Sequence, residues 1–200
     1  MTRTKAAPTL DPMAKVTTNP HRSVYPTPTA LVSSISPEGR ANIITLGEVF
    51  NVSLGKPPIV GLAIRKATYT HGLIAKSGEF VINFPTAGMA RATEICGSTT
   101  GRDTDKFAVA GLTAVPAELV RPPLIAECPV NLECRLRSVQ EVGDHDLFLG
   151  EVLRAHVDED LLDEEGRVRP ERLDPLVFMS NFGHRGEYWS LGTRIAVRGF

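Results

Sequence analysis

Residues 57–83, PPIVGLAIRKATYTHGLIAKSGEFVIN, combine two short apolar runs with a polar segment between them. The runs at 59–64 and 80–84 are continuously apolar, which is typical of strands covered on both faces or of a barrel wall. Residues 68–77 can form about three helical turns, with Thr68 as the N-cap candidate and a glycine just after the last turn. This stretch therefore predicts a strand, a short helix and a second strand.

The junction between the first strand and the helix carries side chains suited to an anion. Arg65, Thr68 and Thr70 offer a guanidinium and two hydroxyls, and the start of a helix adds unpaired N–H groups and a partial positive charge. A guanidinium forms two charge-assisted hydrogen bonds with a phosphate, and helix N-termini bind the same group. We therefore expect a phosphorylated ligand. The alternative interpretation is that Thr68 only caps the helix and Arg65 is a solvated turn residue.

The flanking sequence predicts further antiparallel strands. Two β-rich runs separated by the turn-forming PEGR indicate a hairpin. The two longest runs alternate apolar with polar side chains and are joined by Gly143 and Asp144, which indicates a long hairpin. The predicted hairpins lie at 30–36 with 41–46 and at 130–142 with 145–157, and one or two closing strands are expected within 175–191.

Many short strands with two small helices predict a mainly β fold. A closed or partly closed antiparallel barrel is favoured, because closure removes exposed sheet edges. Residues 1–28 contain five prolines, which interrupt helices and sheet ladders, and are expected to form an irregular arm. Residues 29–200 are expected to form a single domain.

The composition narrows the classes of function. A formal net charge of -1 gives no electrostatic case for nucleic acid or an anionic membrane surface, so neither partner is expected. No apolar run has signal-peptide or bilayer-spanning length, and the three cysteines lack metal-ligand spacing, so a cytoplasmic protein without a metal is expected. Cys128 and Cys134 are interpreted as small buried hydrophobes on one face of a strand. The absence of GxSxG argues against a hydrolase.

Seven short motifs occur in a fixed order along the chain: NIIT at 42–45, PPIVGLAIR at 57–65, YTHGLI at 69–74, FVIN at 80–83, GRDTDKF at 101–107, GDHDLFLGEV at 143–152 and EYWSLG at 187–192. The ordered set resembles the flavin reductase-like, FMN-binding split-barrel family, and the similarity is greatest to its flavoredoxin-type branch. The resemblance implies a six-stranded antiparallel Greek-key split β-barrel with a few short α-helices.

The same resemblance implies a homodimer with non-covalently bound FMN near its interface. The implied activity is hydride transfer from NAD(P)H to the flavin, which then reduces a second flavin or another acceptor. Two other functions stay open. One is an electron-transfer flavoprotein of flavoredoxin type, without its own pyridine nucleotide site and with a protein as electron donor. The other is a flavin- or haem-binding module, since a fold fixes no function by itself.

With FMN as the ligand, the phosphate is assigned to Arg65, Thr68 and Thr70. The resemblance places Thr45, Leu46 and Gly47 along the flavin ring, where backbone N–H groups can approach the ring edge closely. The plain alternative is a hairpin end with a bulge at Gly47. The full predicted cofactor-binding set is Thr45, Leu46, Gly47, Ser53, Ile64, Arg65, Thr68, Thr70, Lys106 and Phe107.

Two other motifs supply candidates near the cofactor. Lys106 can oppose the charge of a phosphate or of reduced flavin, and Phe107 can cover apolar ring surface, unless they are a surface residue and a core anchor. His145 is the catalytic candidate, an imidazole that holds the nicotinamide against the flavin, or else a turn-stabilising histidine. Tyr188 and Trp189 form either an aromatic wall beside the flavin or part of the core or a subunit interface.

Overall fold

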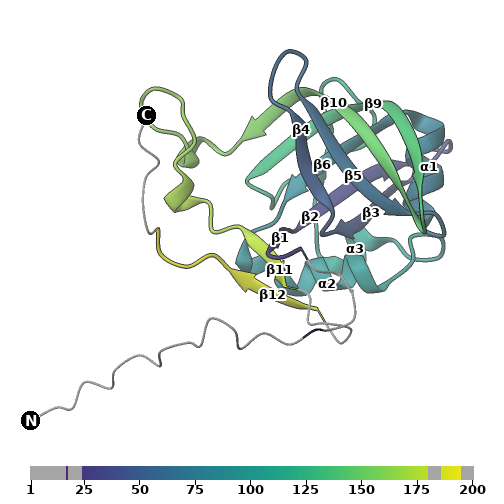
Figure 1. The fold of residues 1–200 in the computed structure, drawn as a ribbon, viewed down its shortest axis with the longest axis horizontal. Coiled ribbons are helices and arrows are strands. Elements are labelled where there is room, and N and C mark those ends of the chain that lie inside the picture. Colours follow the sequence, from purple (N-terminus) through teal and green to yellow (C-terminus); the bar gives the residue numbers. More distant parts are fainter. Residues whose placement is uncertain (1–16, 18–23, 180–185, 195–200) are drawn as a thin grey trace, which may run out of the picture.

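The computed structural model describes residue 17, residues 24–179 and residues 186–194. Its main element is an antiparallel sheet that curls into an incompletely closed barrel (Figure 1). β3 comes close to β5 across the barrel, but the hydrogen-bonded ladder ends at β3 and β4, so the barrel is split. In spatial order the strands are β3 (Ala41–Leu46), β2 (Ala30–Ile35), β6 (Glu79–Phe84), β9 (Val130–Val142), β10 (His145–Val157), β5 (Ile59–Arg65) and β4 (Val49–Ser53).

The predicted fold class, a mainly β split barrel with a few short helices, is confirmed. The predicted strand number is wrong, because the described residues place seven strands in the main sheet and not six. The additional strand is β4, which pairs with β5 at the sheet edge. Phe50 is 48% exposed and Val52 is 49% exposed on this strand. Its apolar residues are therefore not all buried, and hydrophobic periodicity in the sequence does not mark it as a strand.

Both predicted hairpins are present. β2 pairs with β3 from Ala30 opposite Leu46 to Ile35 opposite Ala41, and β9 is joined to β10 by the two residues that the sequence indicates. Shifts in the β9–β10 register occur between Leu149 and Gly150 and again further along the strand. Such bulges bend a strand and increase its twist. The two long strands can therefore follow the curvature of the barrel wall.

Helix α1 (Tyr69–Ser77) lies where the sequence predicts it. Thr68 Oγ1 caps it by accepting a hydrogen bond from the N–H of His71 at 3.3 Å, and Gly78 ends it with φ 70°, which glycine adopts without strain. In Figure 1, α2 and α3 lie below the barrel beside β3, and α1 lies at its right-hand end. In the described part of the chain, no helix is both long and apolar enough to span a bilayer. The other helical segments are η1 (Ala87–Met89), α2 (Ala90–Ser98), α3 (Lys106–Ala110), η2 (Glu159–Leu161) and η3 (Pro170–Arg172).

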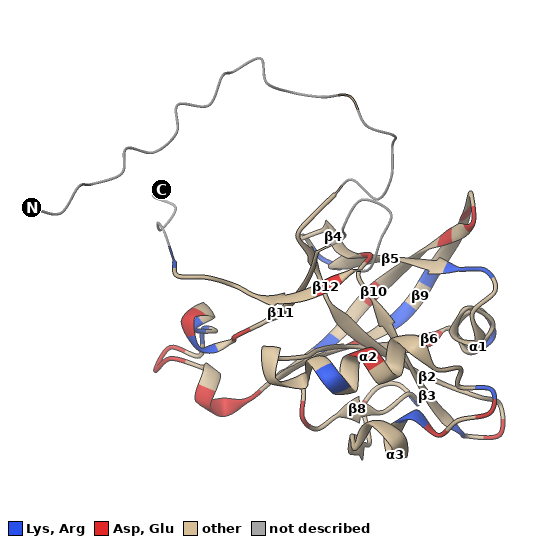
Figure 2. Cartoon of the chain, turned by 90° about the horizontal axis from the view of Figure 1, so that it is seen from below, with Lys and Arg blue, Asp and Glu red and all other residues tan. Residues whose placement is uncertain are grey.

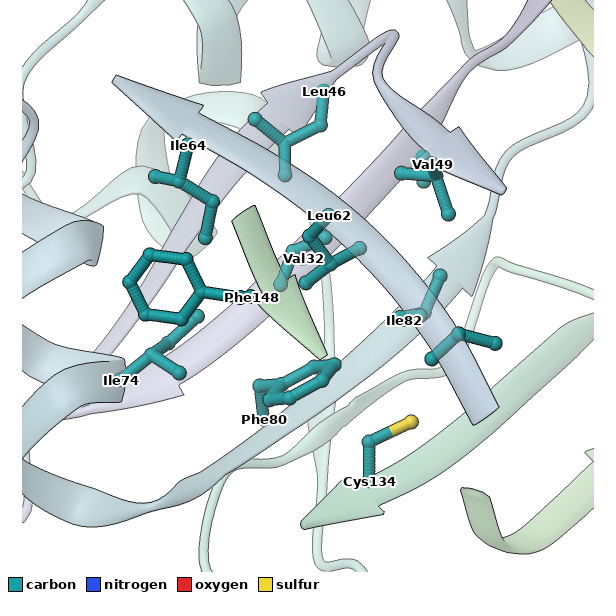
Figure 3. Packing of buried hydrophobic residues seen from close by; sticks show 12 residues of the cluster. Val32, Leu46, Val49, Leu62, Ile64, Ile74, Phe80, Ile82, Cys134 and Phe148 are labelled. Carbon is teal, nitrogen blue, oxygen red and sulfur yellow. The ribbon is translucent and has the colours of Figure 1, made fainter. Parts of the chain in front are cut away.

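The barrel interior is filled by aliphatic and aromatic side chains (Figure 3). Phe80 from β6 and Phe148 from β10 are both completely buried there. Phe80 packs over Gly150 so closely that a Cβ at position 150 would lie 2.3 Å from the Phe80 Cζ atom. Glycine is therefore required at position 150 by packing and not by backbone conformation.

The three cysteines are free and buried, which confirms the interpretation of Cys128 and Cys134 as buried residues. The prediction that these two share one face of a strand is wrong. Cys128 lies before the start of β9 and packs with residues of β3, α2 and α3, whereas Cys134 lies in the barrel interior. Burial raises the pKa of Cys96 to about 11, so its thiol stays protonated at neutral pH.

The strands predicted at 175–191 form a separate sheet and do not close the barrel. In this sheet β11 (Leu176–Met179) lies between β1 (Thr27–Pro28) and β12 (Glu187–Ser190). The physical reason is that β1 offers β11 an edge just before the chain enters the barrel at β2. Most of the arm predicted for 1–28 lies outside the described residues, so the domain division stays a prediction. A further small sheet consists of β7 (Ala114–Val115) and β8 (Leu124–Ile125).

Candidate functional site

A polar cavity of about 210 Å³ lies where the start of α1, the end of α2 and β3 meet. Two glycines, Gly97 and Gly101, form part of its wall. Among the described residues, no Asp or Glu lines it. We call it the threonine cavity, and its lining side chains with polar groups are Asn42, Thr68, Tyr69, Thr70, Thr99, Thr100 and Lys106.

The start of α1 supplies hydrogen-bond donors to this cavity. The Thr68 hydroxyl donates to the Arg65 carbonyl at 2.9 Å and also caps the helix, so it is already engaged. The backbone N–H groups of Tyr69 and Thr70 have no partner within the helix. Thr70 Oγ1 accepts from Asn42 Nδ2 at 2.8 Å and keeps its own hydrogen for donation. A ligand here would meet several donors at the positive end of the helix.

Lys106 brings a buried positive charge to the same cavity. Its side chain is 5% exposed, and its Nζ donates to the Cys96 carbonyl oxygen at 2.7 Å. None of the ion pairs found among the described residues includes Lys106. Burial lowers the pKa of this ammonium, and lysine is almost never buried unless it is paired. A buried cation among hydroxyls and a helix start favours a bound anion.

A second cavity, of about 220 Å³, adjoins the first along β3, and Gly97 lines both. We call it the aromatic cavity, because Phe178 and Tyr188 form part of its wall. The Tyr188 hydroxyl lies 3.2 Å from Glu94 Oε2 and donates to it. Burial, followed by the neighbouring carboxylate, raises the pKa of Tyr188. This phenol therefore remains a proton-bearing donor over the physiological pH range.

Five of the predicted site residues line one of the two cavities. Thr68, Thr70 and Lys106 line the threonine cavity, which fits their predicted place near a phosphate. Thr45 and Gly47 line the aromatic cavity, which fits their predicted place beside a ring. The Thr45 hydroxyl also donates to the Thr93 carbonyl at 2.6 Å, which ties β3 to α2.

Four predicted residues have side chains that do not reach a cavity. Leu46, Ile64 and Phe107 are buried in the hydrophobic clusters, so their side chains are not open to a ligand. Ser53 pairs with Ile59 at the opposite end of β5 from the start of α1, about 20 Å away at 3.3 Å per strand residue. The structure of one chain therefore does not bring Ser53 to the rest of the site.

Arg65 and His145 form a separate pair on the outside of the barrel. They lie directly opposite each other in the β5–β10 ladder, so their side chains share a face. Neither residue lines the threonine or the aromatic cavity. His145 Nδ1 lies 2.8 Å from Asp144 Oδ1, and this hydrogen bond lowers the pKa of Asp144. Arg65, predicted as the first phosphate ligand, is thus placed beside the predicted nicotinamide residue.

The two predicted C-terminal aromatics are placed differently. Tyr188 lines the aromatic cavity, whereas Trp189 is 55% exposed and its Nε1 donates to Glu187 at 3.1 Å. Sequence reasoning missed Thr99 and Thr100, which line the threonine cavity from the end of α2. Their signal is a pair of hydroxyl residues before a glycine, directly ahead of the GRDTDKF motif.

Comparison with known proteins identifies the family of this chain. Its sequence matches the model of the flavin reductase like domain over residues 21–184, which is more than half of its length. The chain belongs to the flavin reductase-like family. This flavin reductase-like protein is 38% identical over 130 residues to an uncharacterized protein of Archaeoglobus fulgidus, and the alignment covers 65% of this chain and 72% of the relative.

Two solved structures extend the comparison of this flavin reductase-like protein. Flavoredoxin of Desulfovibrio vulgaris (Miyazaki F) is 31% identical with a TM-score of 0.83, covering 92% of this chain and 96% of that one. An FMN-binding protein from Thermus thermophilus with bound 1-cyclohex-2-enone is 28% identical with a TM-score of 0.76, covering 92% and 99%. The predicted family and flavoredoxin-type branch are confirmed, and a flavin-related oxidoreductase function is supported.

The residues of the two cavities fit a flavin nucleotide. The threonine cavity offers a cation, hydroxyls and a helix start to a phosphate. The aromatic cavity offers the rings of Phe178 and Tyr188 to a flat ring, and the rest of its lining is mostly polar. Each cavity also holds a buried polar atom without a hydrogen-bond partner among the described residues, Asn42 Oδ1 in the first and Thr29 Oγ1 in the second. Unpaired buried polar atoms are costly unless a ligand or water completes them.

Proposed function

We propose that this protein binds FMN non-covalently along β3 and uses NAD(P)H to reduce it. The proposed position has the phosphate in the threonine cavity and the ring toward the aromatic cavity. The observation that carries the proposal is Lys106, a buried ammonium without a carboxylate partner in the described part of the chain, next to the start of α1. A bound flavin accepts a hydride equivalent and passes electrons to a second flavin or another acceptor.

The side chains of the two cavities have distinct tasks in this proposal. Lys106 and the amides at the start of α1 bind the phosphate, and Thr70 donates a further hydrogen bond. Gly47 lets the backbone come close to the ring edge, because its Cα carries no side chain.

The proposal includes a homodimer. His145 lines neither cavity of its own chain, so its proposed role with the nicotinamide requires the β9–β10 turn of one protomer to approach the flavin of its partner. An exposed apolar edge supports self-association, since Phe50, Val52 and Leu54 are 48%, 49% and 84% exposed on and beside β4. The cytoplasmic location expected from the sequence stays a prediction.

A second function is favoured by a specific observation. Tyr188 and Phe178 wall the aromatic cavity, which leaves less room for a nicotinamide over the ring, and flavoredoxin is among the similar structures. An electron carrier that accepts electrons from a protein would need no nucleotide site. The carrier and the reductase make opposite predictions for direct reduction by NADH or NADPH.

The deciding experiment is a visible spectrum of the purified protein after loading with FMN, followed by anaerobic addition of NADH and then NADPH. A yellow protein that one nucleotide bleaches supports the reductase. A yellow protein that neither nucleotide reduces supports the carrier. A protein that stays colourless after loading and dialysis contradicts flavin binding and both functions.

The role of His145 is tested by the His145→Ala variant. Loss of one hydrogen bond to the nicotinamide should slow reduction by about 2- to 13-fold while FMN stays bound. Gln140→Ala is the matched control, because Gln140 is exposed on the neighbouring strand β9. An unaltered reduction rate in His145→Ala would remove this role.

A further inference from the structure

A third concave site adjoins the threonine cavity on the other side of Thr68 and Tyr69, which line both. Its volume of about 360 Å³ lies in the range of small-molecule pockets, about 300–1,000 Å³. Figure 2 shows Lys and Arg segments beside α1 at this end of the molecule. We call the site the basic cleft, and its ionisable lining side chains other than Tyr69 are Glu38, Lys66, His71, Lys76 and Arg102.

Two of these cations are open to an anionic ligand. Lys66 is engaged, since its Nζ lies 3.2 Å from Asp146 Oδ1. Lys76 and Arg102 have no carboxylate within ion-pair distance over the ranges that the structure describes. The Arg102 guanidinium carbon lies 5.1 Å from the centre of the Tyr69 ring, a cation–π contact that holds it at the boundary between the cleft and the threonine cavity.

The cleft combines this positive rim with an open apolar floor. Pro37 and the buried Leu73 contribute apolar surface. Gly72 lies in the middle of α1, and no heavy atom lies within 4 Å of the position that its Cβ would occupy. Glycine is among the poorest helix formers, and no positive φ requires it at position 72. Its effect is to keep the cleft open above the helix.

We propose that the basic cleft binds the adenylate half of FAD, so that FAD binds this protein more tightly than FMN. The inference rests on the proposed function, which puts the flavin phosphate in the threonine cavity. In FAD a second phosphate is attached directly to that phosphate, followed by a ribose and adenine. Arg102 lies beside Tyr69, where it meets the second phosphate. Lys76 lies in the last turn of α1, about 12 Å along the helix from Thr68, so its charge acts from the far end of the cleft, where the apolar floor receives the adenosine.

NAD(P)H also carries an adenylate, but it fits the position less well. Its nicotinamide has to reach the flavin ring, which the proposed function places toward the aromatic cavity beyond Gly97. The basic cleft adjoins the opposite, phosphate end of the site. The attachment of the adenylate to the flavin phosphate therefore favours FAD as the occupant.

The test compares equilibrium binding of FMN and FAD to the full-length protein by titration. An exposed ion pair changes affinity by about 1.4- to 5-fold, so two cations should make FAD tighter than FMN by about 2- to 30-fold. The double variant Lys76→Glu with Arg102→Glu should abolish this advantage and weaken FAD more than FMN. A variant with Lys56→Glu, an exposed lysine in the β4–β5 connection, controls for a general change of charge.

A steric variant makes the test independent of charge. Gly72→Leu fills the cleft and should lower FAD affinity more than FMN affinity, whereas Ala75→Leu, on the same helix but outside the cleft, should leave the ratio within about twofold. Thermal denaturation of each variant checks that α1 remains folded.

The outcomes separate the two proposals. FMN and FAD binding with equal affinity, or losing affinity equally in both variants, would overturn the assignment of the cleft and leave the proposed function intact. Weaker NADPH binding in the double variant with unchanged FAD binding would also overturn it, because the adenylate would then come from the other nucleotide. Failure of the wild-type protein to bind either flavin would overturn both proposals.

Discussion

Replacing Lys106 by methionine tests whether the threonine cavity is an anion site. Methionine has a similar length and no charge, so the variant removes the ammonium with little change of volume. The side chain is 5% exposed, so a phosphate in the cavity would meet a largely desolvated cation. A hydrogen bond to a charged group contributes about 1.5–3 kcal/mol, and its loss should raise the Kd for FMN roughly 10- to 150-fold.

The assay for Lys106→Met is fluorescence titration with FMN and with riboflavin, which is the same flavin without the phosphate. The wild-type protein should prefer FMN, and the variant should lose this preference while its riboflavin affinity stays the same. Lys56→Met, at an exposed position, provides the matched control. An FMN preference that persists in Lys106→Met, or an equal loss of affinity for both flavins, would refute the reasoning.

The pH dependence of the FMN preference gives an independent check on Lys106. Burial lowers the pKa of this ammonium in the empty protein, so it loses its proton at a lower pH than an ordinary lysine near 10.4. The FMN preference should therefore decline as pH rises toward that value, and riboflavin binding should not follow it. The empty protein should gain stability over the same interval, because the unfolded chain binds more protons there.

Three further predictions concern the surroundings of the site. Arg65→Ala should change the ratio of FMN to riboflavin affinity by about fivefold at most, because this exposed guanidinium lies outside both cavities. A larger loss of FMN affinity would show that Arg65 binds the phosphate. Burial opposes ionisation of Asp146, but hydrogen bonds from His71 and Lys66 outweigh burial and lower the pKa of this carboxyl. Asp146→Asn should therefore lower the melting temperature at pH 7. That difference should shrink as pH falls below about 3.9, where the carboxylate becomes protonated and its stabilisation is lost; a pH-independent difference would contradict the ion pairing. Gly150→Ala should lower the free energy of unfolding by about 1–3 kcal/mol in denaturant titrations, because the added methyl collides with Phe80; an unchanged midpoint would show that the ring can move aside.

The parts of the fold that the sequence predicted depend on local signals. Thr68 and Gly78 bound α1 because a hydroxyl cap and a left-handed glycine act within one helical turn. The β9–β10 hairpin is marked by alternation and by the turn at Gly143. β4 gives no such signal, since Phe50 and Val52 are half exposed at a sheet edge. Whether a segment pairs at an edge is decided by its neighbours in space.

The site was predicted where side-chain direction follows from position in an element. Thr68 and Thr70 begin a helix, so both were expected beside its free N–H groups, and the structure brings Lys106 to them. Arg65 directly follows the inward-facing Ile64, and the alternation of a strand turns it away from the cavity. Thr100 reaches the cavity only through the packing of α2 on β3, which no local pattern reveals.

The cap of α1 also sets the terms on which this protein can evolve. Aspartate caps a helix about as well as threonine, and at position 68 its negative charge would also suit the positive end of the helix. The same charge would repel a phosphate in the adjoining cavity. Selection for thermal stability alone, without selection for cofactor binding, would thus favour aspartate at position 68. The more stable protein would bind its phosphorylated ligand more weakly.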